Sequence, residues 1–325
     1  MPNRKTYGIL SYTDEKRHFA VKGWTICMST YYVLYNPLAG SGQGEERSRK
    51  LTQILQEDTL VYQDITAIDD YAAYFAALPE GAGVIIAGGD GTLNRFINDT
   101  AALTLDFSVF YYATGSGNDF LRDVNTSGAD SPVPVDEYIH NLPRVTVNGK
   151  TYRFLNGVGY GIDGYCCEVG DRMRAEAAKD PANVKPINYA AIAIKGVLGG
   201  FRPVNATVTV DGHTEHFKKV WLAPTMNGRY YGGGMMATPE QKRLGEERTV
   251  STMLIYGAGK LRTLIVFPSI FKGEHVKHTS MVKVFSGKDI TVSFDRPTAL
   301  QIDGETIPNV TEYRVQVTAP VMATV

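Results

Sequence analysis

Hydrophobic positions in the first third of the chain form short, uninterrupted runs, and most of these runs end in a turn signal. Aromatic and branched side chains dominate them, which is typical of buried strands, at residues 31–35, 60–62, 83–87 and 107–112. Segments with a helical pattern lie between or after them, at residues 45–56, 68–78 and 93–102. Strands that alternate with helices predict a parallel α/β sheet whose ligands bind at the carboxyl ends of the strands.

The pattern changes after residue 131, where hydrophobic and polar positions alternate. Asn148-Gly149, Asp211-Gly212 and Ser286-Gly287 separate such runs, and these pairs favour hairpins. We therefore predict an antiparallel β-sandwich, interrupted by one helical stretch near residues 188–198. The expected domains are an α/β domain over 1–135, with a core at 28–135 and an extension at 1–27, and the sandwich over 136–325. The last residues of the chain could pack back on the first domain.

Composition excludes several classes of protein. The formal net charge is -1 over 325 residues, which does not fit a strongly basic nucleic-acid binder. The three cysteines show no CxxC spacing, so neither a disulfide framework nor a structural zinc site is expected. No apolar run reaches the roughly 18–20 residues of a membrane span. We expect a cytoplasmic protein without a transmembrane segment.

Glycine-rich turns follow three of the expected strands. Gly88-Gly89-Asp90-Gly91-Thr92 leaves space for phosphate oxygens to approach backbone N–H groups at the start of a helix, and Asp90 could hold Mg²⁺ or orient a hydroxyl. A plain turn with Asp90 and Thr92 as helix caps is the alternative. Similar turns at 36–40 and 115–119 favour the functional interpretation, because all three would line one cleft.

The order and spacing of these motifs resemble the diacylglycerol kinase catalytic superfamily, which includes bacterial lipid kinases and sphingosine kinases. The matching pieces are Asn36-Pro37-x-x-Gly40, Gly88 to Asn94, Gly115 to Phe120, Phe154-Leu155-Asn156 with Gly161 and Asp163, Asn227-Gly228 with Tyr231 to Gly234, and Gln301 to Glu305. The resemblance implies a nucleotide-binding α/β domain, a C-terminal β-sandwich and a substrate cleft between them.

The resemblance also implies roles for individual residues. ATP with Mg²⁺ is the expected phosphoryl donor, with Glu305 as general base, Asp119 as the next candidate for that role, and Asp90 as a further catalytic residue. Asp90 and Asp303 are the predicted metal ligands. The predicted nucleotide-binding residues are Asn36, Pro37, Gly40, Thr66, Gly88, Gly89, Gly91, Thr92, Ser116 and Asn118.

Two departures from the family pattern stand out. The turn Ala39-Gly40-Ser41 replaces the usual Ser-Gly-Lys and lacks its basic residue. Residues 239–247 lack the Asp-Gly pair that forms part of a structural magnesium site in bacterial relatives.

The expected reaction is transfer of the γ-phosphoryl group of ATP to a lipid hydroxyl, such as that of diacylglycerol, by a kinase that visits the membrane surface. An NAD kinase, or a nucleotide-binding regulator without catalysis, are the alternatives. No nucleic-acid partner is expected. A homodimer is possible, because a strand edge in the β half could pair with a second copy.

Overall fold

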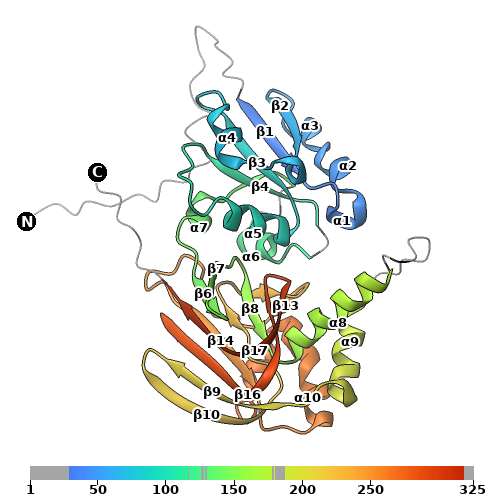
Figure 1. Cartoon of the computed structure of the whole chain (residues 1–325), viewed down its shortest axis with the longest axis vertical. Coiled ribbons are helices and arrows are strands. Elements are labelled where there is room, and N and C mark those ends of the chain that lie inside the picture. Colours follow the sequence, from blue (N-terminus) through green and yellow to red (C-terminus); the bar gives the residue numbers. More distant parts are fainter. Residues whose placement is uncertain are drawn as a thin grey trace, which may run out of the picture.

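Two domains make up the chain, an N-terminal α/β domain and a C-terminal antiparallel β domain, one above the other in Figure 1. Both were predicted from the sequence. The computed structural model describes residues 29–115, 117–125, 128, 130–177, 179 and 187–317, and the structural statements below concern those residues. The predicted extension at 1–27, Ser116 and the end of the chain after residue 317 lie outside them.

The N-terminal sheet has the strand order β2-β1-β3-β4-β5. Its strands are β1 (Thr30–Tyr35), β2 (Thr59–Asp64), β3 (Gly83–Gly88), β4 (Val109–Ala113) and β5 (Val133–Pro134). The first four run parallel, and β5 pairs antiparallel with β4. The carboxyl ends of the four parallel strands therefore meet at one edge, as the alternating pattern predicted.

Helices cover both faces of this sheet, which explains why β3 is buried along its whole length. Val84 and Ile86 face a core that includes Leu93 and Phe96, whereas Ile85 faces the other core with Leu51. The helical elements are α1 (Ala39–Gly42), α2 (Gly44–Ser48), α3 (Leu51–Ile54), η1 (Ile65–Ala67), α4 (Tyr71–Ala76), α5 (Asp90–Asp99), α6 (Asp119–Val124) and α7 (Asp136–Ile139). The helix predicted over 45–56 is thus divided into α2 and α3.

The C-terminal domain is built on one large antiparallel sheet. Its path runs β15-β14-β11-β8-β16-β17-β6-β7, with β9 and β10 attached beside β16. The strands are β6 (Arg144–Val147), β7 (Lys150–Arg153), β8 (Gly157–Tyr160), β9 (Val204–Val210), β10 (His213–Val220), β11 (Thr225–Met226), β14 (Val250–Ile255), β15 (Val282–Gly287), β16 (Asp289–Ile302) and β17 (Glu305–Gln316). A separate hairpin pairs β12 (Tyr230–Tyr231) with β13 (Met235–Met236).

Strand β16 organises this domain because it serves two different neighbours. Residues 290–294 pair with β9, whereas residues 300–302 pair with β8, and the register with β17 shifts between Ser293 and Thr298. The sheet encloses a core with the stacked rings of Tyr160 and Phe294, whose centroids lie 3.7 Å apart. The turn after β16 carries Asp303 and Glu305 toward the N-terminal domain (Figure 1).

A helical group packs on one side of the β domain. It contains α8 (Ile162–Ala177), α9 (Tyr189–Lys195), the π-helix η3 (Gly196–Gly200), α10 (Lys260–Val266), η4 (Phe267–Lys272) and η5 (Glu274–Lys277). These elements share a second core with Trp221 and Met253. Helix α9 agrees with the predicted helical stretch, but the longer α8 was not anticipated.

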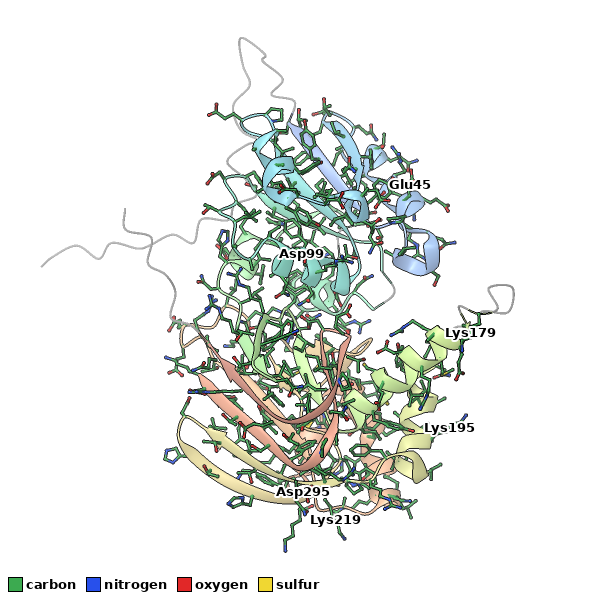
Figure 2. The ribbon with its side chains drawn as sticks, viewed as in Figure 1. Glu45, Asp99, Lys179, Lys195, Lys219 and Asp295 are labelled. Carbon is green, nitrogen blue, oxygen red and sulfur yellow. The ribbon has the colours of Figure 1, made fainter. Side chains whose placement is uncertain are left out.

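Between the two sheets, α7 follows β5 and Ile139 packs into the core of the N-terminal domain. The domain boundary between residues 135 and 136 stays a prediction. Charged residues such as Glu45, Lys195 and Lys219 lie at the surface (Figure 2). Within the described ranges, none of the helices combines the length and apolar character needed to cross a membrane.

Candidate active site

The loops after β1, β3 and β4 meet at the carboxyl edge of the N-terminal sheet. Gly89 and Gly115 pack backbone against backbone there, because a Cβ added to Gly115 would lie 2.5 Å from the Cα of Gly89. Thr114 donates its N–H to the carbonyl of Gly88 at 2.8 Å, which fixes the two loops against each other. Glycine at position 115 therefore permits a close approach that a side chain there would prevent.

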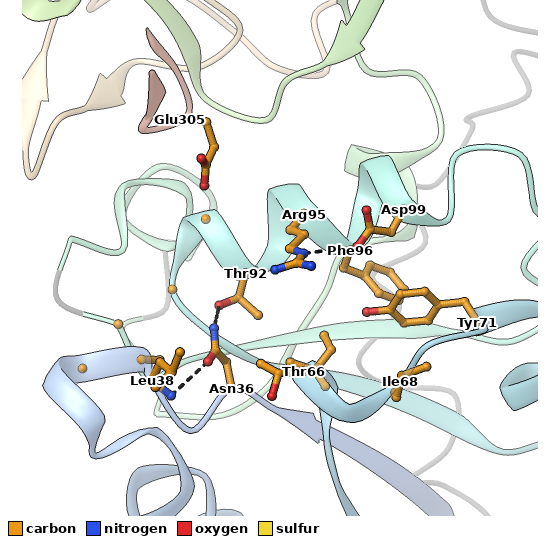
Figure 3. A pocket seen from close by; sticks show the side chains of 16 residues that line it. Asn36, Leu38, Thr66, Ile68, Tyr71, Thr92, Arg95, Phe96, Asp99 and Glu305 are labelled. Atoms are coloured by element: carbon orange, nitrogen blue, oxygen red, sulfur yellow. Dashed lines mark hydrogen bonds and ion pairs between the residues drawn. The ribbon is translucent and has the colours of Figure 1, made fainter. Parts of the chain in front are cut away.

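A cavity of about 370 Å³ opens beside these loops (Figure 3). It lies between the strand ends, one side of α5 and the β16–β17 turn. Among the predicted nucleotide-binding residues, six line it: Asn36, Gly40, Thr66, Gly89, Gly91 and Thr92. Pro37, Gly88 and Asn118 do not line it, and Ser116 is outside the described residues. Glu305 lines the same cavity from the other domain.

Asn36 connects the loop after β1 to α5. Its Nδ2 donates to Thr92 Oγ1 at 2.9 Å, and its Oδ1 accepts from the N–H of Leu38 at 3.0 Å (Figure 3). Glycine at position 88 leaves the space that Thr92 occupies in this contact, because a Cβ there would lie 2.4 Å from the Cβ of Thr92. The predicted Asn36, Gly88 and Thr92 thus form one packed unit at the N-terminal end of α5.

The turn around Gly40 acquires a basic neighbour through the fold. Gly40 is buried with a φ of 57°, a conformation that glycine adopts without steric cost. Arg47 of α2 donates Nη1 to the carbonyl of Thr114 at 3.0 Å and lies where a Cβ on Gly40 would collide with it. The sequence showed no basic residue in the turn itself, and a position seven residues further along the chain gave no local signal for this contact.

Asp90 is the first residue of α5, and its carboxylate faces α6. Asp90 Oδ2 accepts from the N–H of Asp119 at 2.6 Å, and Oδ1 accepts from the N–H of Phe120 at 3.3 Å. Burial raises the pKa of Asp90, and these hydrogen bonds oppose that shift. Asp90 is outside the set of residues that line the cavity, so its contacts in the protein cap α6 rather than reach the open space.

Asp119 joins the two domains. Its Oδ2 accepts from the N–H of Gly233, in the turn of the β12–β13 hairpin, at 2.7 Å, and Arg122 lies 3.4 Å from Oδ1. Burial raises the pKa of Asp119 to about 6, with the nearby charge of Asp90 adding to the shift. Its neighbour Asn118 has a φ of 49° and donates Nδ2 to the carbonyl of Gly115 at 3.0 Å.

Asp303 is held by hydrogen bonds from both domains. Oδ2 accepts from Asn94 Nδ2 at 2.6 Å and from the N–H of Leu155 at 2.5 Å. Oδ1 accepts from the N–H groups of Asn156 and Gly157 at 2.8 and 2.9 Å. Burial raises the pKa of Asp303 to about 6 despite these donors. A carboxylate offers about four acceptor positions, so this one is fully used, and its predicted metal role stays a prediction.

Glu305 differs from Asp303 although only Gly304 separates them. It is exposed, and in Figure 3 its carboxylate points toward the N-terminal end of α5. Gly304 has a φ of 98°, which permits the tight turn that directs the two carboxylates to different places. Glu305 therefore faces the cavity while Asp303 fastens the turn that carries it.

Several cavity residues were missed by the sequence reasoning. Arg95 and Asp99 continue the row of Gly91 and Thr92 along one face of α5, and Arg95 Nε lies 3.4 Å from Asp99 Oδ2. The spacing of three and four residues could have identified them. Ile65, Ile68 and Tyr71 give the far end of the cavity an apolar wall.

A third interdomain contact is centred on Arg243. Its Nε donates to Asp123 Oδ2 at 2.6 Å, Nη1 to the carbonyl of Leu155 at 2.5 Å and Nη2 to Asn156 Oδ1 at 2.6 Å. The side chains of Arg243 and Asp123 are each only 5% exposed. Arg243 lies in the 239–247 segment, so the segment that lacks the Asp-Gly pair contributes a buried guanidinium.

Over the described part of the chain, His, Cys, Asp and Glu side chains do not gather in groups of three or more that could hold a metal ion. Asp90 uses each oxygen for one close backbone N–H and keeps further acceptor capacity. Such an arrangement does not form an all-protein metal cage. It does fit Mg²⁺ that is held mainly by substrate phosphates and one carboxylate.

Comparison with known proteins gives matches along almost the whole chain. Residues 30–147 match the family described as diacylglycerol kinase catalytic domain, and residues 157–323 match the family described as YegS C-terminal NAD kinase beta sandwich-like domain. YtlR of Bacillus subtilis, provisionally named a lipid kinase, is 24% identical over 324 residues, covering 89% of this chain and 96% of its own. The diacylglycerol kinase of the same organism is 25% identical over 287 residues, covering 84% and 88%.

Among solved structures, a diacylglycerol kinase from Bacillus anthracis is similar with a TM-score of 0.55 and 17% identity, over 90% of this chain and 94% of that one. At this identity the likeness supports the fold alone. It agrees with the order of an α/β domain followed by an antiparallel β domain.

Proposed function

Since this chain belongs to the diacylglycerol kinase catalytic family, we propose that it transfers the γ-phosphoryl group of ATP to the hydroxyl of a lipid, with diacylglycerol as the first candidate. One observation carries the proposal. Glu305 of the β domain lines the same cavity as the glycine-rich turns of the α/β domain, so an acidic side chain faces the place suited to phosphates. The runner-up, an NAD kinase, is tested by the same experiment.

The cavity has the properties of a nucleotide site. Its volume of about 370 Å³ falls within the usual range of ligand pockets, which is about 300–1,000 Å³. The N-terminal end of α5 offers unpaired N–H groups and the positive end of a helix dipole, and Gly91 leaves open space where a Cβ would stand. We place the phosphates of ATP there, with the positive charge of Arg95 nearby. We place the adenine ring near Ile68 and Tyr71.

Mg²⁺ is the cation we expect with the nucleotide. When bound, it would neutralise charge on the transferring phosphate. In this chain Asp90 is the carboxylate with remaining acceptor capacity, whereas Asp303 is occupied by four donors. We therefore propose Asp90 as the protein ligand that would hold the ion together with the phosphates of the nucleotide.

Glu305 is the proposed general base. A base must come within hydrogen-bond reach of the hydroxyl whose proton it accepts, and Glu305 projects into the cavity from the tip of a hairpin. As the oxygen of the acceptor bonds to the γ-phosphorus, its proton passes to the Glu305 carboxylate and ADP leaves. Asp119 is the second candidate, although its carboxylate is engaged with the N–H of Gly233.

The test is phosphorylation with ³²P-labelled ATP and Mg²⁺, followed by chromatography and mass spectrometry of the product. Diacylglycerol, sphingosine and a prenol are offered in mixed micelles, and NAD is offered in solution. We expect label in a lipid phosphate that depends on wild-type Glu305. Label in NADP with none in any lipid would establish the NAD kinase alternative. ATP binding without any labelled product would favour a regulator that has lost catalysis.

A further inference from the structure

Helix α10 presents apolar side chains to solvent as well as to the core. Thr263 and Val266 are buried against the β domain. Leu261 and Ile265, four residues apart and therefore on one face, are 74% and 70% exposed. Phe271, in the adjoining η4, is 46% exposed. Such large exposed aliphatic side chains on one helix face need a partner or a function to explain them.

The end of α9 and the π-helix η3 add to the same surface. Ile194 and Leu198, again four residues apart, are 48% and 57% exposed, whereas Val197 is buried in the shared core. Lys260 at the start of α10 donates Nζ to the carbonyl of Leu198 at 2.6 Å, which joins the two elements. We call the surface formed by Ile194, Leu198, Leu261 and Ile265 the α9–α10 face. Figure 1 shows α9 and α10 together on one side of the β domain.

The charged side chains of the two segments that form this face are all positive. Neither residues 189–202 nor residues 257–273 contain an aspartate or a glutamate, although the whole chain has 34 acidic residues. The two segments carry five basic residues: Lys195, Arg202, Lys260, Arg262 and Lys272. Lys195 lies at the outer edge of α9 in Figure 2. The segments that carry the exposed apolar side chains are thus basic in a protein whose net charge is -1.

The combination of exposed apolar and basic side chains favours one of two possible partners for this face, a membrane, over the other, a second copy of the chain. In a two-fold dimer the same patch meets itself, so the five basic residues of these two segments would meet their own copies, and neither segment supplies an acidic partner. A bilayer with anionic lipids offers the complementary surface, because its phosphates attract Lys and Arg while aliphatic side chains enter the interface.

We propose that the α9–α10 face docks the protein on an anionic membrane surface. The inference rests on the proposed lipid substrate for its purpose, since docking would bring the enzyme to the bilayer that holds the acceptor. The four residues of this face are not among those that line the cavity. The docking proposal can therefore be wrong while the kinase proposal is right.

The experiment is sedimentation of the full chain with vesicles of phosphatidylcholine mixed with phosphatidylglycerol, and with vesicles of phosphatidylcholine alone. We expect binding to the anionic vesicles that weakens with salt. The double variant Leu261→Glu with Ile265→Glu should lower the partition coefficient by about 100-fold, because it removes two apolar side chains and adds two repelled charges. Val61→Glu, at an exposed apolar position on β2 (39%), is the matched control and should bind normally.

Activity measurements separate this proposal from the kinase proposal. The double variant should phosphorylate a dispersed short-chain lipid as fast as the wild type and lose at least about tenfold on vesicles. Its unchanged melting temperature would show that it folds. Vesicle binding equal to that of the wild type would overturn the membrane proposal even if lipid turnover is confirmed. A wild-type dimer that the double variant converts to a monomer would also overturn it, with a second copy as the occupant. If the wild type binds vesicles and the double variant does not, the α9–α10 face is supported as the docking surface, even if no lipid is phosphorylated.

Discussion

Replacing Arg243 with alanine is expected to destabilise the protein strongly, because it leaves the buried Asp123 with only the partly exposed Arg229 as its ion partner. The guanidinium makes three hydrogen bonds of 2.5–2.6 Å, to Asp123, to the carbonyl of Leu155 and to Asn156, and it lies 5.0 Å over the ring of Phe120. Removing one partner of a buried ion pair typically costs about 3–5 kcal/mol. The remaining pair with Arg229 lowers this cost, whereas the lost donors to Leu155 and Asn156 raise it, so the substitution is expected within that range.

The magnitude can be measured by thermal unfolding. At about 2–4 °C per kcal/mol, a loss of this size lowers the melting temperature by roughly 6–20 °C. Arg229→Ala provides a matched control, because Arg229 bonds the other oxygen of Asp123 at 2.7 Å but its side chain is 36% exposed. Partly exposed pairs contribute only about 0–1 kcal/mol. The control should therefore shift the melting temperature by a few degrees at most.

A double variant separates the effect of the buried Asp123 charge from the effect of the packing that is lost with the Arg243 side chain. Asp123→Asn combined with Arg243→Ala removes both charges and should regain part of the stability that Arg243→Ala alone loses. The reasoning would be refuted if Arg243→Ala melted within a few degrees of Arg229→Ala. It would also be refuted if the double variant lost more stability than the two single variants lose when their losses are added together.

Three further predictions concern the cavity and a buried acid. Gly91→Val should remove the rise in melting temperature that ATP with Mg²⁺ produces, while the fold persists, because no atom lies within 4 Å of the added Cβ. Glu305→Gln should lower kcat by about 10²–10⁴-fold with little change in ATP affinity, as measured by steady-state kinetics and calorimetry. Burial raises the pKa of Asp163 to about 6, so the folded state binds its proton more tightly than the unfolded chain, and stability falls as the pH rises through 6. Asp163→Asn keeps an acceptor for Gln301 and should be more stable than the wild type by about 1–3 kcal/mol at pH 8, by about half of that at pH 5, and by little at about pH 4, in urea unfolding.

Each of these variants has a control in the same chain. Gly259→Val, also in open space but distant from the cavity, should leave the ATP effect intact. Glu312→Gln changes an exposed acid on the same strand as Glu305 and should keep kcat. Asp106→Asn makes the same substitution at an exposed position and should leave stability close to that of the wild type. Normal ATP binding by Gly91→Val, a retained kcat for Glu305→Gln, or a pH-independent gain for Asp163→Asn would contradict the respective argument.

The edge of the parallel sheet could be predicted from the sequence because its signals are local. A buried run such as 83–87 indicates a strand, and the glycines that follow it indicate a turn with close backbone approach. Parallel strands then bring their carboxyl ends to the same edge without further information. Asn36, Gly89 and Thr92 were identified as neighbours on this basis, and the structure brings them to one cavity.

Long-range contacts and ambiguous helices could not be predicted in the same way. Helix α8 has buried glycines at Gly164 and Gly170, which carry no hydrophobic side chain, so its pattern of hydrophobic positions is weak. Gly164 is buried because a Cβ there would lie 1.9 Å from the carbonyl of Ala299, a partner 135 residues away. The contacts of Arg47 and Arg243 likewise depend on segments that only the folded chain brings together.

The acidic residues near the cleft show how the same side chain type takes different roles in one site. Asp119 accepts the N–H of Gly233 in the β domain, and Asp303 accepts Nδ2 of Asn94 in the α/β domain, so both carboxylates help to hold the two domains together. The cavity itself is lined by two acids, Asp99 and Glu305, and Asp99 is paired with Arg95. Among the described residues Glu305 is thus the cavity acid without a hydrogen bond to another side chain. A group that must accept a proton from a substrate needs this freedom, whereas the groups that position it need the opposite.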